Sequence, residues 1–349
     1  MSFADYMKRG KEHGFMKISI KKISELTGYS PATVSNAISG RRTVSKEASD
    51  RILEAAREHG FLDHMQIKKI KFVNFKNSGT ICTDTPFFTA VIEGVTKESQ
   101  RLGYEVTLCT LSRQQKDYEA ALEQLLNETG CAILLLATEM SPEDARPFES
   151  FAGPLVMLDC SMENMKFHTV YHSNTESMMQ ATEYLIACGH QNIGYLAGNI
   201  RIKNFLDRQA GYECVLARHG IALNPDHQFL LTPTVEGSYI DMNERLLSCR
   251  DLPTAFIADN DNIALGAIRA LKQHGYKIPD EISVIGFDDV PFCTISAPAL
   301  TTIHVHKEKL GQIALKRLAE LIPDPDKDVV RTKIQVCNEL VVRDSVKRL

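Results

Sequence analysis

The strongest constraint on the fold is a regular alternation of short β-rich runs and longer helical patterns, which starts near residue 71 and continues almost to the C-terminus. A chain that alternates in this way typically forms parallel sheets with helices on both faces. Because roughly 270 residues are too many for one open sheet, two doubly wound α/β subdomains are expected. Strands are predicted over 71–75, 104–109, 132–137, 155–159, 192–197, 255–258, 282–287 and 301–305, and helices over 87–102, 116–128, 176–188, 205–219, 239–247, 262–274 and 308–321.

The composition favours a soluble cytoplasmic protein. Of the 349 residues, 44% are hydrophobic and 24% are charged, as in ordinary globular domains. There is no run of about 18 apolar residues that could span a membrane, and the first 30 residues lack the apolar segment of a signal peptide. The nine cysteines occur singly and without zinc-type spacing, which favours reduced thiols. We therefore expect no membrane span, no structural metal and no secretion.

The charge is distributed unevenly along the chain. Residues 1–71 contain 14 Lys and Arg against 8 Asp and Glu, a net charge of +6, while the remainder carries −10. A small basic head on a larger acidic body suggests that the head contacts a polyanion. A solvated basic segment without a partner would show the same charge.

The head is predicted to contain three short helices. Ser19 can cap a helix over 20–27, and Ser30 followed by proline is a start signal for a second helix over 31–39. Ser45 can cap a third helix that ends near residue 59. Two helices joined by a tight turn, with a third behind them, form a helix-turn-helix unit whose second helix can enter the DNA major groove. Any small helical hairpin could give a similar pattern.

Acidic and amide side chains follow several predicted strands of the body. Asp159, the run 259–261 and the pair 288–289 occupy such positions. Open α/β sheets bind ligands beyond the carboxyl ends of their strands, so these side chains suit a hydroxyl-rich small molecule. They could equally cap the helices that follow. No dinucleotide-binding, P-loop, metalloprotease or nucleophile-elbow motif is present, so no enzymatic activity and no cofactor are expected.

Several long motifs resemble one family of bacterial transcription regulators. The head contains SPATVS followed by VSKEASDRILEAA, and the body contains GHQNIGYLAG, AFIADNDNIALGAIRALKQHGYKIPDEISVIGFDD and PALTTIHV, in this order. From about Met16 to the last strand, the chain resembles the lactose/galactose repressor (LacI/GalR) family. The resemblance implies a helix-turn-helix head at 16–60, a hinge at 61–71 and a core at 72–349 like the type I periplasmic binding proteins. Its first subdomain would comprise about 72–173 plus 304–325, and its second about 174–303 plus 330–349.

The resemblance also implies a function. We expect an allosteric homodimer that binds double-stranded operator DNA and responds to a small-molecule effector, usually a sugar or sugar derivative. The simplest form is a repressor of carbohydrate-utilisation genes. The sequence leaves open a global carbon regulator whose co-effector is a phosphoprotein. A sugar-binding receptor without a DNA role is a further alternative, against which the basic head and the missing signal peptide argue. An enzyme using Asp288, Arg208 and Asp159 as acid–base groups lacks a nucleophile, a metal set and a cofactor motif.

The resemblance places DNA contacts in the head and at the hinge. Asn36 is the strongest candidate for reading a base, because its amide can bond an adenine edge with two hydrogen bonds. Ile70 stands where the family has a leucine that inserts into the minor groove, although the family's proline, asparagine and arginine are missing from this hinge. The full set of DNA-binding candidates is Lys21, Ser30, Ala32, Thr33, Ser35, Asn36, Arg41, Arg42 and Ile70.

The resemblance places effector contacts in both subdomains. Arg208 matches an effector-binding arginine whose planar fork can hold two hydroxyls or a carboxylate. One of the two phenylalanines at 87–88 is expected to pack on the effector and the other to join the core. Asp261 is expected to cap the following helix. The effector-binding candidates are Asp84, Phe87, Phe88, Asp159, Arg208, Asn260 and Asp288.

Overall fold

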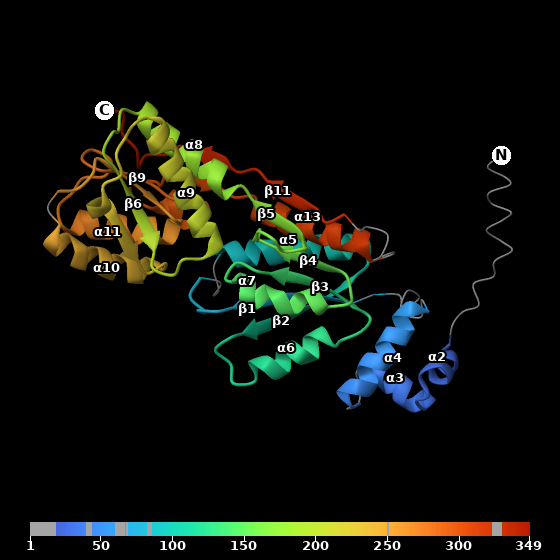
Figure 1. Cartoon of the computed structure of the whole chain (residues 1–349). Helices are drawn as coiled ribbons and strands as arrows, with labels where there is room; N and C mark the ends of the chain where they lie inside the picture. The colour runs from blue at the N-terminus through green and yellow to red at the C-terminus, as the bar shows by residue number, and fades with distance from the viewer. Residues whose placement is uncertain are drawn as a thin grey trace, which may run out of the picture. The chain divides into compact units, whose positions relative to one another are not determined.

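The computed structural model describes residues 19–39, 44–59, 67, 69–81, 86–249, 251–322 and 330–349. They form a small N-terminal head and a large core that starts at Lys69 (Figure 1). Within these ranges, none of the helices combines the length and the apolar character needed to cross a bilayer.

The head consists of α2 (Ile20–Thr27), α3 (Pro31–Ser39) and α4 (Lys46–Glu58). The Ser19 hydroxyl accepts a hydrogen bond from the backbone N–H of Lys22, and Gly28 ends α2 with a φ of 77°. All three helices were predicted from their cap residues and are confirmed to within one residue. They enclose a small core formed by Ile23, Val34, Ala37, Ile38, Ile52 and Ala56.

The first core sheet has six strands in the order β11-β5-β4-β3-β1-β2, and β11 with β5, β5 with β4, β4 with β3, and β1 with β2 pair in parallel. Helices α5 and α13 pack together on one face, and α6 and α7 lie on the other (Figure 1). The elements are β1 (Lys69–Lys76), α5 (Pro86–Leu102), β2 (Glu105–Ser112), α6 (Tyr118–Leu126), β3 (Cys131–Leu136), α7 (Pro142–Ala145), the 3₁₀ helix η2 (Arg146–Ser150), β4 (Leu155–Leu158), β5 (His168–His172), α13 (Lys307–Leu321) and β11 (Lys333–Val336).

The second core sheet has four parallel strands in the order β7-β6-β8-β9. Helices α8 and α9 bury apolar side chains on one face, and α10 and α11 bury theirs on the other. The elements are α8 (Asn174–Ala187), β6 (Ile193–Gly198), α9 (Lys203–Arg218), the 3₁₀ helix η3 (Pro225–His227), β7 (Gln228–Leu231), α10 (Val235–Ser248), β8 (Ala255–Ala258), α11 (Asp261–Gln273), β9 (Ser283–Ile285), α12 (Phe292–Ile295), β10 (Thr302–His304) and β12 (Glu339–Val341). The doubly wound two-subdomain architecture is therefore confirmed.

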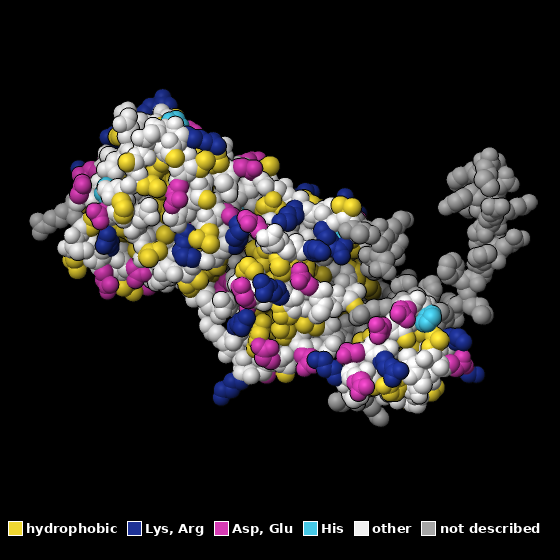
Figure 2. Space-filling view, viewed as in Figure 1, with side chains coloured by type: hydrophobic (Ala, Val, Ile, Leu, Met, Phe, Trp, Pro, Cys, Tyr) yellow, Lys and Arg dark blue, Asp and Glu magenta, His cyan; other side chains and the backbone are white. Residues whose placement is uncertain are grey.

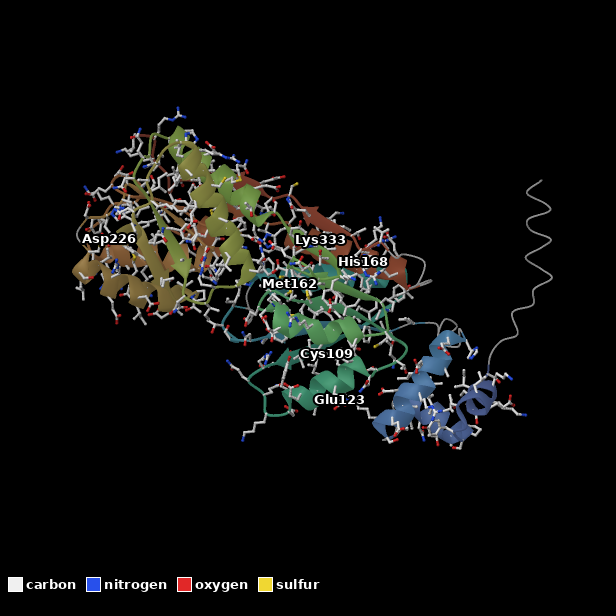
Figure 3. The ribbon with its side chains drawn as sticks, viewed as in Figure 1. Cys109, Glu123, Met162, His168, Asp226 and Lys333 are labelled. Carbon is white, nitrogen blue, oxygen red and sulfur yellow. The ribbon has the colours of Figure 1, made fainter. Side chains whose placement is uncertain are left out.

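The chain crosses between the two subdomains three times, after β5, after β10 and after β11. The predicted boundary at the third crossing is wrong, because the whole of 330–349 was assigned to the second subdomain. The structure instead pairs β11 with β5 in the first sheet, and Figure 3 labels Lys333 and His168 on these neighbouring strands. Lys333 also donates a hydrogen bond to the carbonyl of Met162 at 2.8 Å. A four-residue edge strand carries too little pattern to be recognised from the sequence.

The predicted role of Ile70 as a minor-groove wedge is also wrong. Ile70 lies in β1, is 0% exposed and stands opposite Val106 of β2. The segment alternates lysine with apolar residues, and β-branched isoleucine favours a strand whose apolar side faces the core. The hinge interpretation therefore ends before Lys69, and the remainder of its range, except residue 67, lies outside the described residues.

Two glycines set the close packing of α5 against α13. A Cβ atom on Gly94 would lie 1.9 Å from the carbonyl oxygen of Glu308, and one on Gly311 would lie 2.3 Å from that of Val91. Only glycine permits this backbone approach. The helix pair therefore forms a rigid support beneath the sheet that carries the first half of the candidate site.

Candidate functional site

Two aspartates with unusual backbone geometry mark the candidate site, of which Asp159 is buried and Asp288 is partly buried. Asp159 follows β4 with a φ of 62°, and Asp288 follows β9 with a φ of 109°. Positive φ is uncommon outside glycine, and such strain is concentrated at functional sites. Asp159 belongs to the first subdomain and Asp288 to the second. Each half of the core therefore supplies one carboxylate, carried by a residue with a strained backbone.

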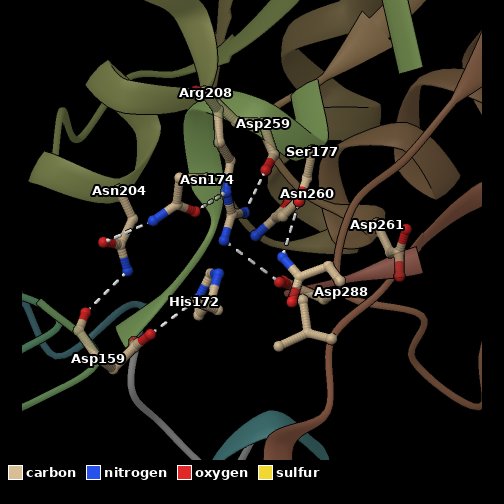
Figure 4. Close-up of polar contacts among 12 residues, drawn as sticks. Asp159, His172, Asn174, Ser177, Asn204, Arg208, Asp259, Asn260, Asp261 and Asp288 are labelled. Carbon is tan, nitrogen blue, oxygen red and sulfur yellow. Dashed lines mark hydrogen bonds and ion pairs between the residues drawn. The ribbon is translucent and has the colours of Figure 1, made fainter. Parts of the chain in front are cut away.

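Arg208 of α9 lies at the centre of a hydrogen-bond network (Figure 4). Its side chain is only 4% exposed, and its guanidinium carbon lies 3.7 Å from the ring centroid of Phe287. Its Nε donates to Asn174 Oδ1 at 2.8 Å, and one terminal nitrogen donates to the carbonyl of Asp259 at 2.5 Å. The other terminal nitrogen lies 3.4 Å from Asp288 Oδ1. The network holds the guanidinium plane in one orientation.

Two asparagines extend this network into the first subdomain. Asn174 Nδ2 donates to Asn204 Oδ1 at 3.1 Å, and Asn204 Nδ2 donates to the carbonyl of Asp159 at 3.0 Å (Figure 4). Both amides are buried. A continuous series of hydrogen bonds therefore connects Arg208 to the backbone of Asp159.

His172 and Asp159 leave buried polar atoms without a hydrogen-bond partner. His172 Nε2 lies 2.8 Å from Asp159 Oδ1, but the contact lacks hydrogen-bond geometry, and His172 Nδ1 has no partner either. The other Asp159 oxygen accepts from the Thr138 hydroxyl at 2.6 Å. The imidazole lies between the rings of Phe87 and Phe287, at centroid distances of 6.2 and 6.0 Å. Unsatisfied buried polar atoms are rare, so this pair is an unusual feature of the site.

Burial governs the electrostatics of the second-subdomain carboxylates. It raises the pKa of Asp288, an effect that Arg208 and then Lys307 partly offset. Burial also raises the pKa of Asp259, and the positive charge of Arg201 partly offsets this rise. For Asp261, burial and the neighbouring Asp288 raise the pKa to about 7. Burial therefore raises the pKa of all three of these carboxyl groups.

The predicted cap of α11 is wrong, because Asn260 and not Asp261 occupies that position. Asn260, expected to bind the effector, is the N-cap of α11, and its side-chain oxygen accepts from the N–H of Ile263 at 3.0 Å. Asp261, expected to cap that helix, instead accepts from the Thr302 hydroxyl and from the N–H of Val290. Amide and carboxylate compete for the same cap, and the choice depends on the turn that follows β9.

The first-subdomain candidates are only partly placed. Phe87 contacts His172 and faces the site, whereas Phe88 packs against Phe72 of β1 at a centroid distance of 6.0 Å. Asp84 lies outside the described residues. Three residues that belong to the network, His172, Asn174 and Asn204, were not predicted. The position of His172 and Asn174 at the first crossing between subdomains is the signal that could have identified them.

The head presents the DNA-binding candidates on α3. Ser30 and Ala32 are exposed, and Thr33, Ser35 and Asn36 are half-buried, while Val34 points into the core. The Ser30 hydroxyl is the cap of α3 and accepts from the N–H of Thr33 at 3.1 Å.

The basic excess of the head lies largely outside the described residues. Ranges 19–39 and 44–59 hold five basic and five acidic residues, and Figure 2 shows both signs on the head. Arg41 and Arg42 lie outside the described residues, whereas Lys21 is described and exposed.

Comparison with known proteins assigns the family. Residues 19–63 match the family model for bacterial regulatory proteins of the lacI family, and residues 182–346 match that for a periplasmic binding protein-like domain. The chain is 32% identical over 334 residues to the HTH-type transcriptional repressor PurR of Mannheimia succiniciproducens. The alignment covers 95% of this chain and 99% of that protein. The chain is 31% identical over 335 residues to PurR of Haemophilus influenzae, with the same coverage. The chain therefore belongs to the LacI family of bacterial regulatory proteins.

Solved structures agree with this assignment at the level of the fold. The transcriptional regulator CelR in complex with cellobiose has a TM-score of 0.72 at 22% identity, and the Lac repressor bound to ONPG has a TM-score of 0.70 at 23% identity. In both cases 94% of this chain and 99% of the other are covered.

Proposed function

We propose that the chain is an effector-responsive transcriptional repressor that acts in the cytoplasm and has no enzymatic activity. The observation that carries the proposal is the buried cluster of Asp159, His172, Arg208 and Asp288, to which each subdomain contributes. A small molecule that satisfies the unpartnered atoms of Asp159 and His172 would contact groups from both halves of the core. Its binding energy would then favour the closed arrangement of the subdomains.

The DNA-binding half of the proposal rests on α3. Its outward side chains are short and polar, as expected for direct contact with base edges, and Asn36 carries the amide best suited to adenine. Phosphate contacts would come from Lys21 and from the arginines after α3. The protein is expected to bind DNA with a steep salt dependence, because each neutralised phosphate releases counterions.

Selection of binding sites from a pool of random DNA tests the proposal. The full chain is expected to enrich a near-palindromic motif, and Asn36→Ala is expected to relax the choice of one base pair in each half-site by about 1–3 kcal/mol. Glu25→Ala on the exposed face of α2 serves as a control. Failure of the wild type to enrich any motif would refute the proposed function.

A homodimer is the assembly that we propose. Strands β2 and β7 form the edges of the two sheets, and each exposes a leucine, Leu108 and Leu230, by more than half. Leu247 at the end of α10 and Ile295 of α12 are more than three-quarters exposed. We propose that some of these side chains are buried against a second copy of the chain. Sedimentation is expected to show a dimer for wild type. For Leu247→Glu it is expected to show weaker association of the two copies.

A further inference from the structure

The charges of the candidate site are already balanced among its own residues. Arg208 faces Asp288, and Arg201 forms an ion pair with Asp259 while also donating to the carbonyl of Gly198. Lys307 is buried and donates to the backbone carbonyls of Asp288, Asp289 and Val305. Each of these three cations therefore already has negatively charged or carbonyl partners.

The site offers a ligand two carboxylates and the His172 imidazole. Asp159 Oδ1 accepts no hydrogen bond, although His172 Nε2 lies 2.8 Å from it, and Arg208 and Lys307 donate to other groups. Asp288 uses one oxygen for Arg208. A carboxylate accepts hydrogen bonds and offers none when ionised. A ligand must therefore bring N–H or O–H donors to Asp159 and Asp288.

An anionic ligand would meet two unfavourable effects here. It would place a negative charge beside two carboxylates in a site where burial weakens solvent screening. To reach Arg208 or Lys307 it would also have to displace Asp288 or the carbonyls around it. Removing one partner of a buried charged pair leaves the other group uncompensated, which is strongly unfavourable.

We propose that the site selects an uncharged effector rich in hydroxyl or amino donors and rejects its phosphorylated or carboxylated counterpart. Asp288 and Asp159 are the residues that determine this specificity. The inference rests on the proposed function, because it assumes that this cluster is the effector site. Asp288 contributes in two ways, since it repels the anion and occupies the guanidinium that the anion would need.

The experiment measures the melting temperature of the full chain in rising concentrations of inorganic phosphate, against potassium chloride at matched ionic strength. Wild type is expected to show no phosphate-specific rise. Asp288→Asn is expected to gain a saturable rise, with phosphate binding at least about tenfold tighter than in wild type, because Arg208 then lacks a carboxylate partner. Asp226→Asn, which changes an exposed aspartate of η3 (Figure 3), is the matched control and is expected to behave like wild type.

A saturable phosphate-specific rise in wild type would overturn the inference, and so would a folded Asp288→Asn variant that gains none. If Asp288→Asn does not fold, Asp159→Asn tests the repulsion alone, because it removes the second carboxylate and leaves Arg208 paired with Asp288; a folded Asp159→Asn variant without any gain in phosphate binding would then overturn the inference. In a further arm, the melting temperature is compared between adenosine and adenosine monophosphate, and between ribose and ribose 5-phosphate. A rise in the melting temperature of wild type with a phosphorylated compound, but not with its unphosphorylated counterpart, would contradict the proposal. Motif enrichment in the DNA selection does not depend on this result, so the two hypotheses can fail separately.

Discussion

Replacing Ile70 with alanine distinguishes a core residue from a DNA-inserting one. Ile70 is fully buried in β1 opposite Val106, so the truncation removes three carbon atoms from a packed interior. Ile→Ala changes in such cores cost about 2–5 kcal/mol, and Ile→Val changes cost about 0.5–1.5 kcal/mol. We therefore expect Ile70→Ala to lower the urea midpoint of the core transition clearly and Ile70→Val to lower it slightly.

DNA binding provides the second measurement. At a temperature where wild type and Ile70→Ala are both folded, operator affinity and the DNA bend angle are expected to be equal, since a buried strand residue cannot reach a base step. Thr107→Ala, on an exposed position of the adjacent strand β2, controls for changes at the sheet edge. Unchanged stability together with a weaker, less bent operator complex would refute the assignment of Ile70 to the core.

Three further changes test the network around the site. Asn204→Ala is expected to destabilise the core by about 1–3 kcal/mol, as seen in urea unfolding, because it leaves the amide of Asn174 and the carbonyl of Asp159 without partners. Asp261, with a pKa of about 7 in the fold against 3.8 as its ordinary value, binds a proton more tightly when folded. Stability is therefore expected to fall by about 3 kcal/mol between pH 4 and 7, and Asp261→Asn should flatten this slope. The buried carboxylate of Glu139 accepts hydrogen bonds from N–H groups of residues 77–81. Glu139→Gln is therefore expected to speed hydrogen exchange at these amides, and unchanged exchange would show that the carboxylate does not hold this turn.

Local signals explain why the head was predicted so closely. The serine caps, the proline after Ser30 and the left-handed Gly28 each act within four residues, and they define the ends of α2 and α3. Long helices of the core were found for the same reason, since their apolar periodicity extends over several turns. Strands β5, β7, β11 and β12 were missed, because each is short and contains polar residues. The equally short β4 and β8 were found because they are continuous apolar runs.

The sequence predicted those site residues whose position follows from the strand pattern. Asp159 follows a strand of the first sheet and Asp288 a strand of the second. Open parallel sheets bind ligands beyond the carboxyl ends of their strands, so both residues could be predicted as site candidates. Asn174 and Asn204 join the site only because α8 packs against α9, which places side chains 30 residues apart within hydrogen-bond distance. No local pattern contains that contact. The hydrogen bonds that engage Asp261 likewise come from Val290 and Thr302, which are 29 and 41 residues away in the sequence.

Strand β1 connects the two functions of the molecule through the covalent chain. Its first residue, Lys69, follows directly from the segment after the head, and its last residue leads into the turn at 77–81. The buried carboxylate of Glu139 accepts hydrogen bonds from the N–H groups of Asn77, Ser78 and Ile81 in that turn.

The neighbour of Glu139, Thr138, donates to Asp159. One dipeptide after β3 therefore holds both the turn beyond β1 and the strained aspartate of the site. A ligand that draws Asp159 toward Arg208 acts on the same rigid unit to which the far end of β1 is attached. Any effect of the ligand on DNA affinity must then be matched by an equal effect of DNA on ligand affinity, because the two equilibria share one free energy of coupling.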